Sequence, residues 1–185
     1  MRKSMSQNTP PLLTKTFSPV TLEQSADIAR ATAELALTWL AHPDMRTHGI
    51  RVWLRGDLGA GKTTWVREFL IRCGISGRIK SPSFSVVESY EHNGVTFHHI
   101  DFYRQAEPTT WQSAGLRDVI GDRAVTLIEW PEHAAGLPPP HIDVAIDWAL
   151  PAEAGGPRRI TVTFFNRHDG PGLERLLDAW QHGCP

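Results

Sequence analysis

The sequence has few cysteines, almost no net charge and no long apolar run. Its two cysteines, Cys73 and Cys184, show neither a Cys-x-x-Cys nor a Cys/His spacing, so the pattern offers no zinc motif and no disulfide framework. Nineteen basic and twenty acidic side chains give a formal net charge of -1, which excludes a broad electrostatic surface for nucleic acid or membrane but allows a local basic patch. No apolar run reaches the roughly 18 to 20 residues that span a bilayer. We expect a cytoplasmic protein without membrane association.

The domain organisation predicted from the sequence is simple. The first 14 residues are polar and interrupted by prolines, and they lack the apolar centre of a signal peptide, so residues 1–14 are interpreted as a disordered leader. A chain of 185 residues, of which 41% are hydrophobic, can bury one ordinary core. Residues 15–185 are therefore expected to form a single domain.

Strand and helix patterns alternate along the chain, which favours an α/β fold. Thr21 and Gln24 have the spacing of a capping box at the start of a helix that runs to about Ala41. Residues 50–56 predict a strand that ends at glycine, and residues 62–73 predict a helix with one apolar face.

The second half of the chain contains mainly strand patterns. Two strands are predicted to meet at Asn93-Gly94, a strong hairpin signal. The other predictions are a short helix at 107–116, a strand at 124–130, an antiparallel pair at 141–150 and 158–165, and a closing helix at 172–181. We therefore expect a mixed, largely parallel central sheet with an antiparallel hairpin at its margin.

The most specific motif is GDLGAGKT, which begins at Gly56 and matches G-x-x-x-x-G-K-[ST] at every fixed position. It lies between a predicted strand and a predicted helix, where a phosphate-binding loop, or P-loop, belongs. Its glycines, among them Gly59 and Gly61, let backbone N–H groups approach the phosphates. Lys62 supplies a charge for the β- and γ-phosphates, and Thr63 offers a hydroxyl to Mg²⁺. The motif predicts a P-loop NTPase-like three-layer fold.

A P-loop enzyme needs an acid at the end of another buried strand, and two carboxylates qualify. Asp101 ends VTFHHID and Glu129 ends AVTLIE, of which the second is the more uniformly apolar, as expected of a central strand. Glu129 is therefore the predicted Walker B residue, facing Mg²⁺ or its waters. Asp101 is a candidate to position the attacking water or to hold a metal-bound water, or else a structural cap or ion-pair partner. Which of the two orients the water stays open.

Three other features allow more than one interpretation. The Ser-Pro-Ser at 81–83 could sense a γ-phosphate or form an ordinary turn. Trp130 could cover a nucleotide, face a partner or pack in the core, and Pro131 prevents further strand pairing. Several histidines form no metal-spaced set and are interpreted as surface or strand-packing residues: His98, His99, His133 and His141.

Four stretches, GDLGAGKTT, KSPSFSVVESY, HIDFYR and LIEWPE, occur in the order and approximate spacing of the TsaE family, formerly YjeE. The resemblance extends from about Phe17 to Phe165. It implies a small bacterial P-loop ATPase needed to make threonylcarbamoyladenosine in tRNA. It also implies that TsaD and TsaB are partners, that the ATP cycle resets their complex between turnovers, and that tRNA is engaged only indirectly.

The resemblance also implies roles for individual residues. ATP would be bound through Gly59, Ala60, Gly61, Lys62, Thr63 and Thr64, with Glu23 near the base. Mg²⁺ would be held by Thr63 and Glu129, and the catalytic residues would be Lys62, Asp101 and Glu129. One departure is that Ser83 replaces the threonine usual in the family, which keeps the hydroxyl but loses a methyl group.

Three other functions compete with this interpretation. A GTP-dependent switch would use the NRHD at 166–169 and the DVIG at 118–121, but Asp118 does not follow a buried strand and Arg167 replaces the expected lysine. A small-molecule kinase would use arginines as phosphate clamps, but no lid insertion is evident; the candidates are Arg104, Arg117 and Arg123. A nucleotide-binding module without hydrolysis is the third.

Overall fold

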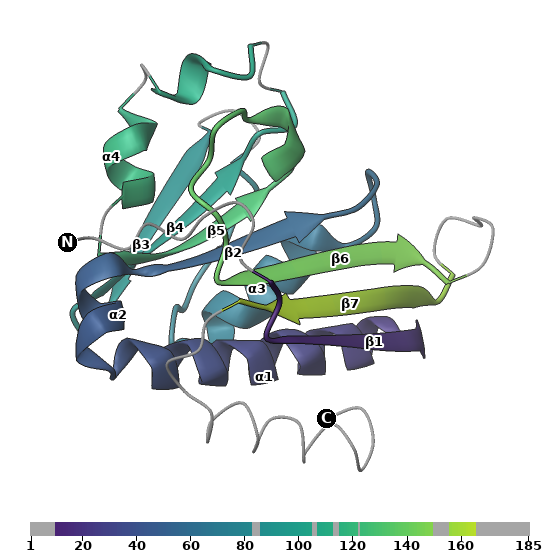
Figure 1. The fold of residues 1–185 in the computed structure, drawn as a ribbon. Coiled ribbons are helices and arrows are strands. Elements are labelled where there is room, and N and C mark those ends of the chain that lie inside the picture. The colour runs from purple at the N-terminus through teal and green to yellow at the C-terminus, as the bar shows by residue number, and fades with distance from the viewer. Residues whose placement is uncertain are drawn as a thin grey trace.

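The fold is a seven-stranded sheet with helices packed against it, and the computed structural model describes residues 10–82, 86–104, 107–112, 115–121, 123–149 and 156–165. In chain order the elements are β1 (Leu13–Val20), α1 (Leu22–Leu40), α2 (Pro43–His48), β2 (Ile50–Arg55), α3 (Lys62–Arg72), β3 (Val87–His92), β4 (Val95–Asp101), η1 (Thr110–Gln112), α4 (Leu116–Gly121), β5 (Ala124–Glu129), η2 (Pro131–His133), β6 (Ile142–Trp148) and β7 (Arg158–Phe164). The strand order across the sheet is β1-β7-β6-β2-β5-β4-β3 (Figure 1).

The sheet is mixed, as the sequence predicts. β4, β5, β2 and β6 run parallel to one another at its centre, and β3 joins β4 in an antiparallel hairpin. The hairpin turns at Asn93 and Gly94, both of which have positive φ angles, 50° and 73°. β6 and β7 also pair antiparallel, so each margin of the sheet has an antiparallel arrangement.

β1 is a correction to the predicted boundaries. Leu13 and Thr14, which the sequence analysis assigned to a disordered leader, pair with Phe164 and Thr163 of β7. From Leu13 to Ser18 the residues of β1 alternate between half-buried and exposed, but only Val20 is fully buried, so the strand lacks the run of alternating core residues by which strands are detected. β1 is held instead by backbone pairing with β7, some 150 residues later in the chain. The local sequence does not encode a pairing of that kind.

α1 begins as its sequence predicts. The Thr21 hydroxyl accepts from the Gln24 amide at 3.2 Å, and the Gln24 side chain accepts from the Thr21 amide at 2.9 Å, which completes a capping box. α1 runs in the same direction as α3, because Arg30 pairs with Glu68 and Arg72 with Glu34 at the same 38-residue separation. The first turns of both helices therefore lie at the same end of the molecule.

Two hydrophobic clusters on opposite faces of the sheet give the three layers that the sequence predicts. The larger contains residues of α1 and α3, such as Trp39 and Phe69, packed against β2, β5, β6 and β7. The smaller joins β4 and β5 to η1 and α4 through Ile128, Trp111 and Ile120. Figure 1 shows α1 and α3 together on one side of the sheet, with α4 beside β3 and β4.

Two helix predictions need comment. The helix expected at 107–116 is wrong in extent: Thr110–Gln112 form one 3₁₀ turn, and Leu116 already belongs to α4, which begins after Gly115 with its φ of 76°. The closing helix predicted at 172–181 lies outside the described residues. Within the ranges that the structure describes, none of the helices combines the length and hydropathy needed to cross a bilayer.

Candidate nucleotide site

The candidate site lies where the carboxyl ends of three parallel strands meet. β2 and β5 align Leu54 with Glu129, and β4 and β5 align Asp101 with Glu129. The P-loop follows β2 directly, so the two predicted acids and the loop are neighbours in space. In parallel α/β sheets, ligands bind at this edge.

The P-loop leads into α3 with a conformation that suits an anion. Gly61 precedes the helix with φ 113°, and α3 begins at Lys62. Among the described residues, no side chain caps the N-terminus of α3, so its first amide groups remain available as donors. An uncapped helix N-terminus of this kind favours a phosphate.

A cavity of about 890 Å³ opens between the P-loop and the ends of β4 and β5. It is lined by Leu58, Gly59, Gly61, Lys62, Thr63, Thr64, Ser81, Pro82, Val86, Asp101, Tyr103, Arg104, Thr110, Glu129 and Trp130. The structure thus brings together seven of the nine site residues named from the sequence.

Lys62 is folded back over its own loop. Its ammonium group donates to the carbonyl oxygens of Gly56 at 2.6 Å and Asp57 at 2.9 Å. It also lies 3.8 Å from the ring centroid of Trp130, a cation–π contact. Burial lowers the pKa of Lys62, and the nearby carboxylates, Glu129 first among them, oppose that shift. Because carbonyl oxygens carry no net charge, the ammonium group of Lys62 has no direct ion-pair partner in these contacts. A phosphate would therefore compete strongly with the two carbonyl oxygens for the ammonium group.

Glu129 is buried, with 2% of its surface exposed, although an acid at the end of a strand could equally have faced solvent. One carboxylate oxygen accepts from the Thr63 hydroxyl at 3.1 Å, and the other lies 2.8 Å from Nε2 of His99. These contacts, with Lys62 nearby, offset part of the cost of a buried charge. Thr63 and Glu129 are thus adjacent at the cavity wall.

Asp101 acts as a structural cap and also lines the cavity, and its role toward an attacking water stays a prediction. One of its oxygens accepts from the Tyr103 amide at 2.9 Å, which caps the turn after β4, and the other accepts from the Ser81 hydroxyl at 3.3 Å. Its side chain also lines the cavity. Burial is the main cause of a raised pKa for Asp101, and the negative charge of Glu129 adds to the shift. Of the Ser-Pro-Ser stretch, Ser81 and Pro82 reach the cavity, and Ser83 is outside the described residues.

The chain matches the family model for the threonylcarbamoyl adenosine biosynthesis protein TsaE over residues 22–155. The chain belongs to the TsaE family. It is 44% identical over 100 residues to the tRNA threonylcarbamoyladenosine biosynthesis protein TsaE of Haemophilus influenzae, an alignment that covers 54% of this chain and 63% of that protein. It is 34% identical over 114 residues to the protein of the same name from Treponema pallidum, covering 62% of this chain and 82% of that one.

A solved structure has the same fold as this TsaE family member. The crystal structure of YdiB from Bacillus subtilis matches with a TM-score of 0.64 and 26% identity over 90% of this chain and 96% of that one. The alignments to the first curated relatives are shorter: they span 63% of the Haemophilus influenzae protein and 57% of its Rickettsia felis counterpart.

Two site residues that the TsaE resemblance implies do not line the cavity. Ala60 is buried within the loop, and its amide donates to the Asp57 carbonyl at 3.1 Å. Glu23 is exposed in the first turn of α1, at the same end of the molecule as the P-loop because α1 and α3 run in the same direction. A contact between Glu23 and a base stays a prediction.

Trp130 takes a conformation that the sequence did not predict. Its φ of 56° is left-handed, and its amide extends the ladder by donating to the Leu54 carbonyl at 3.2 Å. The indole covers Lys62 and lies 4.9 Å from the ring of Tyr103 and 5.1 Å from that of His133. Trp130 therefore forms part of the cavity wall and also packs against the smaller hydrophobic cluster.

Sequence reasoning missed two side chains that support the TsaE site. His99 is fully buried against Glu129, whereas it was interpreted as an ordinary strand histidine. Arg158 donates from Nε to the Ala60 carbonyl at 3.2 Å and lies 4.8 Å from the ring of Trp148. The alternation of β4 places His99 on the same face as Asp101 and could have found it, but no local signal connects Arg158 to a loop 98 residues away.

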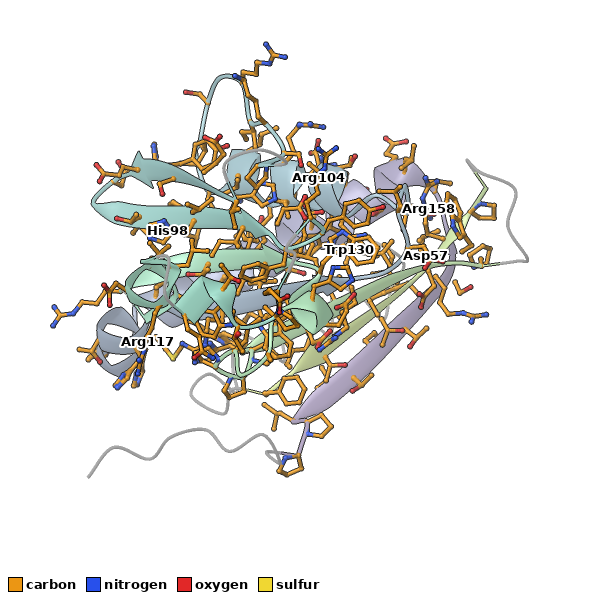
Figure 2. All side chains as sticks on the ribbon, turned by 90° about the horizontal axis from the view of Figure 1, so that it is seen from above. Asp57, His98, Arg104, Arg117, Trp130 and Arg158 are labelled. Carbon is orange, nitrogen blue, oxygen red and sulfur yellow. The ribbon has the colours of Figure 1, made fainter. Side chains whose placement is uncertain are left out.

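Among the described residues, those proposed for the alternative functions do not gather at this cavity. Arg104 lines it, but Arg123 lies against a different hollow, and Arg117 is on α4. Figure 2 shows Arg117 far from Arg104 and Trp130. Asp118 is also on α4 rather than at a strand end, and the stretch at 166–169 is outside the described residues. The described arginines therefore do not assemble a kinase clamp, and the guanine-reading stretch is not tested.

The side-chain oxygens of Thr63 and Glu129 at the cavity wall are suitable ligands for Mg²⁺. This cation prefers oxygen ligands and usually takes one or two from the protein, with phosphate and water oxygens completing its shell. Thr63 supplies a hydroxyl and Glu129 a carboxylate, 3.1 Å apart. No cluster of three or more His, Cys, Asp or Glu side chains that could hold a metal ion occurs in the described part of the chain.

Proposed function

We propose that this chain is an Mg²⁺-dependent ATP-binding and ATP-hydrolysing subunit that supports threonylcarbamoyl transfer to adenosine in tRNA. The observation that carries the proposal is the contact between Thr63 and Glu129 beside the uncapped N-terminus of α3. The hydroxyl and the carboxylate are the two protein ligands expected for Mg²⁺ in a P-loop site. The TsaE family is named for threonylcarbamoyl adenosine biosynthesis, which supplies the process.

The side chains divide the work of phosphoryl transfer. The α3 amides and Lys62 would bind the phosphates once Lys62 exchanges its two carbonyl contacts for phosphate oxygens. Bound Mg²⁺, held by Thr63 and Glu129, would supply neutralisation of charge on the phosphates. Asp101, which accepts from the Tyr103 amide, would accept a hydrogen bond from the attacking water. Trp130 and Tyr103 would restrict the access of other water.

The partners in this proposal are the TsaD and TsaB proteins, and the protein contacts tRNA only indirectly. The proposed location is the cytoplasm. Among the described residues that line the cavity, the one arginine is Arg104, and it is exposed. A slow ATPase that depends on its partners fits this arrangement. Its hydrolysis would drive the cycle of the TsaD–TsaB complex rather than carry out the transfer chemistry.

Two experiments test the proposal separately. Reconstitution with TsaD and TsaB should show multiple-turnover modification of tRNA only when this protein and ATP are present, and unchanged turnover without it would contradict the role in the process. Calorimetry with ADP and GDP should show tighter binding of ADP. Tighter binding of GDP would favour the molecular switch instead.

A further inference from the structure

The carboxylate of Glu129 is held on both of its oxygens by side chains from two different elements. Thr63 of α3 donates to one oxygen, and His99 of β4 contacts the other through Nε2 at 2.8 Å. His99 has no exposed surface and Glu129 has 2%. A buried carboxylate that is hydrogen-bonded at both oxygens is restricted to one rotamer.

Among the described residues, the one hydrogen-bond partner of the His99 imidazole is Glu129. A carboxylate oxygen can only accept, so Nε2 must carry the hydrogen in this pair. Nδ1 is buried and has no hydrogen-bond partner among the described residues. An unpaired polar atom in the interior costs free energy that an apolar side chain of similar size would avoid. The bond to Glu129 is therefore what the histidine contributes at this position.

We propose that His99 is a positioning residue: it holds one oxygen of Glu129 so that the other faces Thr63 and the metal side of the nucleotide. The inference rests on the proposed function. His99 does not line the cavity, so it acts through Glu129 and not on the nucleotide itself. Partners of this kind behind a metal ligand change metal affinity more than they change the affinity for the rest of the ligand.

The test compares variants on one strand. His99→Leu removes the donor, and His99→Gln replaces it, because the amide nitrogen of glutamine reaches about the same position as Nε2. His98→Leu is the matched control: His98 is also buried on β4, but it lies on the opposite face and contacts Ser89 at 2.9 Å. For each variant, calorimetry gives ADP affinity in EDTA and across a Mg²⁺ titration, and hydrolysis gives the Mg²⁺ concentration at half-maximal rate.

We expect His99→Leu to raise the half-saturating Mg²⁺ concentration about tenfold or more, with ADP affinity in EDTA within about twofold of wild type. His99→Gln should return the Mg²⁺ midpoint to within about threefold of wild type, and His98→Leu should leave it unchanged. If the leucine variant does not fold, His99→Asn takes its place, because the shorter amide cannot reach Glu129. Its midpoint should then exceed that of the glutamine variant.

Two results would overturn the inference, and they differ from failure of the proposed function. In the first, hydrolysis by wild type depends on Mg²⁺ and His99→Leu has the same half-saturating Mg²⁺ concentration. His99 would then only fill space, even if the variant melts at a lower temperature. The same conclusion follows if the asparagine and glutamine variants share one midpoint. If nucleotide binding and hydrolysis by wild type are indifferent to Mg²⁺, the proposed function itself is wrong and the role for His99 falls with it.

Discussion

Replacing Gly56 by alanine tests how the P-loop leaves the sheet. Gly56 has a φ of 130°, and a Cβ atom placed on it would lie 2.1 Å from the carbonyl oxygen of Ile146 and 3.0 Å from its carbonyl carbon. Both atoms belong to the backbone of β6, which is paired with β2 on one side and β7 on the other. They cannot rotate away as a side chain would, so the strand itself would have to move.

The expected loss of stability has two parts. A Cβ atom in a left-handed backbone conformation costs about 1–2 kcal/mol. Overpacking against a neighbour that cannot relax adds about 1–3 kcal/mol. Gly56→Ala should therefore lower the free energy of unfolding by about 2–5 kcal/mol. At about 2–4 °C per kcal/mol for a chain of this size, the melting temperature would fall by about 4–20 °C.

The matched control is Gly77→Ala. Gly77 also has a positive φ, 92°, but a Cβ atom there would have no neighbour within 4 Å. Only the backbone cost of about 1–2 kcal/mol should appear. Urea unfolding followed by circular dichroism measures both variants. Equal stability of the two would refute the reasoning, because the close approach to β6 would then carry no cost.

Three further substitutions separate the roles of the site residues. Lys62→Ala should weaken ADP binding about tenfold or more by calorimetry, because the loop loses its phosphate charge; unchanged affinity would contradict that role. Asp101→Asn keeps an oxygen that can accept from the Tyr103 amide, so it should spare the melting temperature while lowering hydrolysis about 100-fold; unchanged hydrolysis would leave Asp101 as a cap alone. Arg158→Lys loses the hydrogen bond to the Ala60 carbonyl and should lower the free energy of unfolding in urea by about 1.5–3 kcal/mol. Arg159→Lys, at an exposed position, should lower it by almost nothing. Similar losses of stability in the two variants would count against the contact.

Local sequence signals predicted the features that depend on near neighbours. The capping box of Thr21 and Gln24, the turn at Asn93-Gly94 and the junction of strand, P-loop and helix each involve residues only a few positions apart. The placement of Asp101 and Glu129 followed from a general property, that the ends of adjacent parallel strands meet. These predictions needed no knowledge of register.

The features that were missed depend on register and on distant segments. β1 is held by pairing with β7, and only one of its residues, Val20, is fully buried, so its apolar pattern is weak. The contact between His99 and Glu129 requires that two strands be aligned to the residue. The left-handed conformation of Trp130 is imposed by the bond to Leu54 and the turn into η2, which a tryptophan would not adopt by preference. Arg158 reaches the P-loop only because β7 lies beyond β6 in the sheet.

The central claim is that Glu129 and Thr63 form the metal side of an ATP-hydrolysing site, and Glu129→Gln tests it most directly. The amide can still accept from His99 and contact Thr63, and it removes a buried charge, so the fold should be preserved. The measurement is Mg²⁺-dependent ATP hydrolysis in the presence of TsaD and TsaB, with the melting temperature as a control for folding. A folded Glu129→Gln protein should lose this hydrolysis. A folded variant that hydrolyses ATP at the wild-type rate would contradict the account.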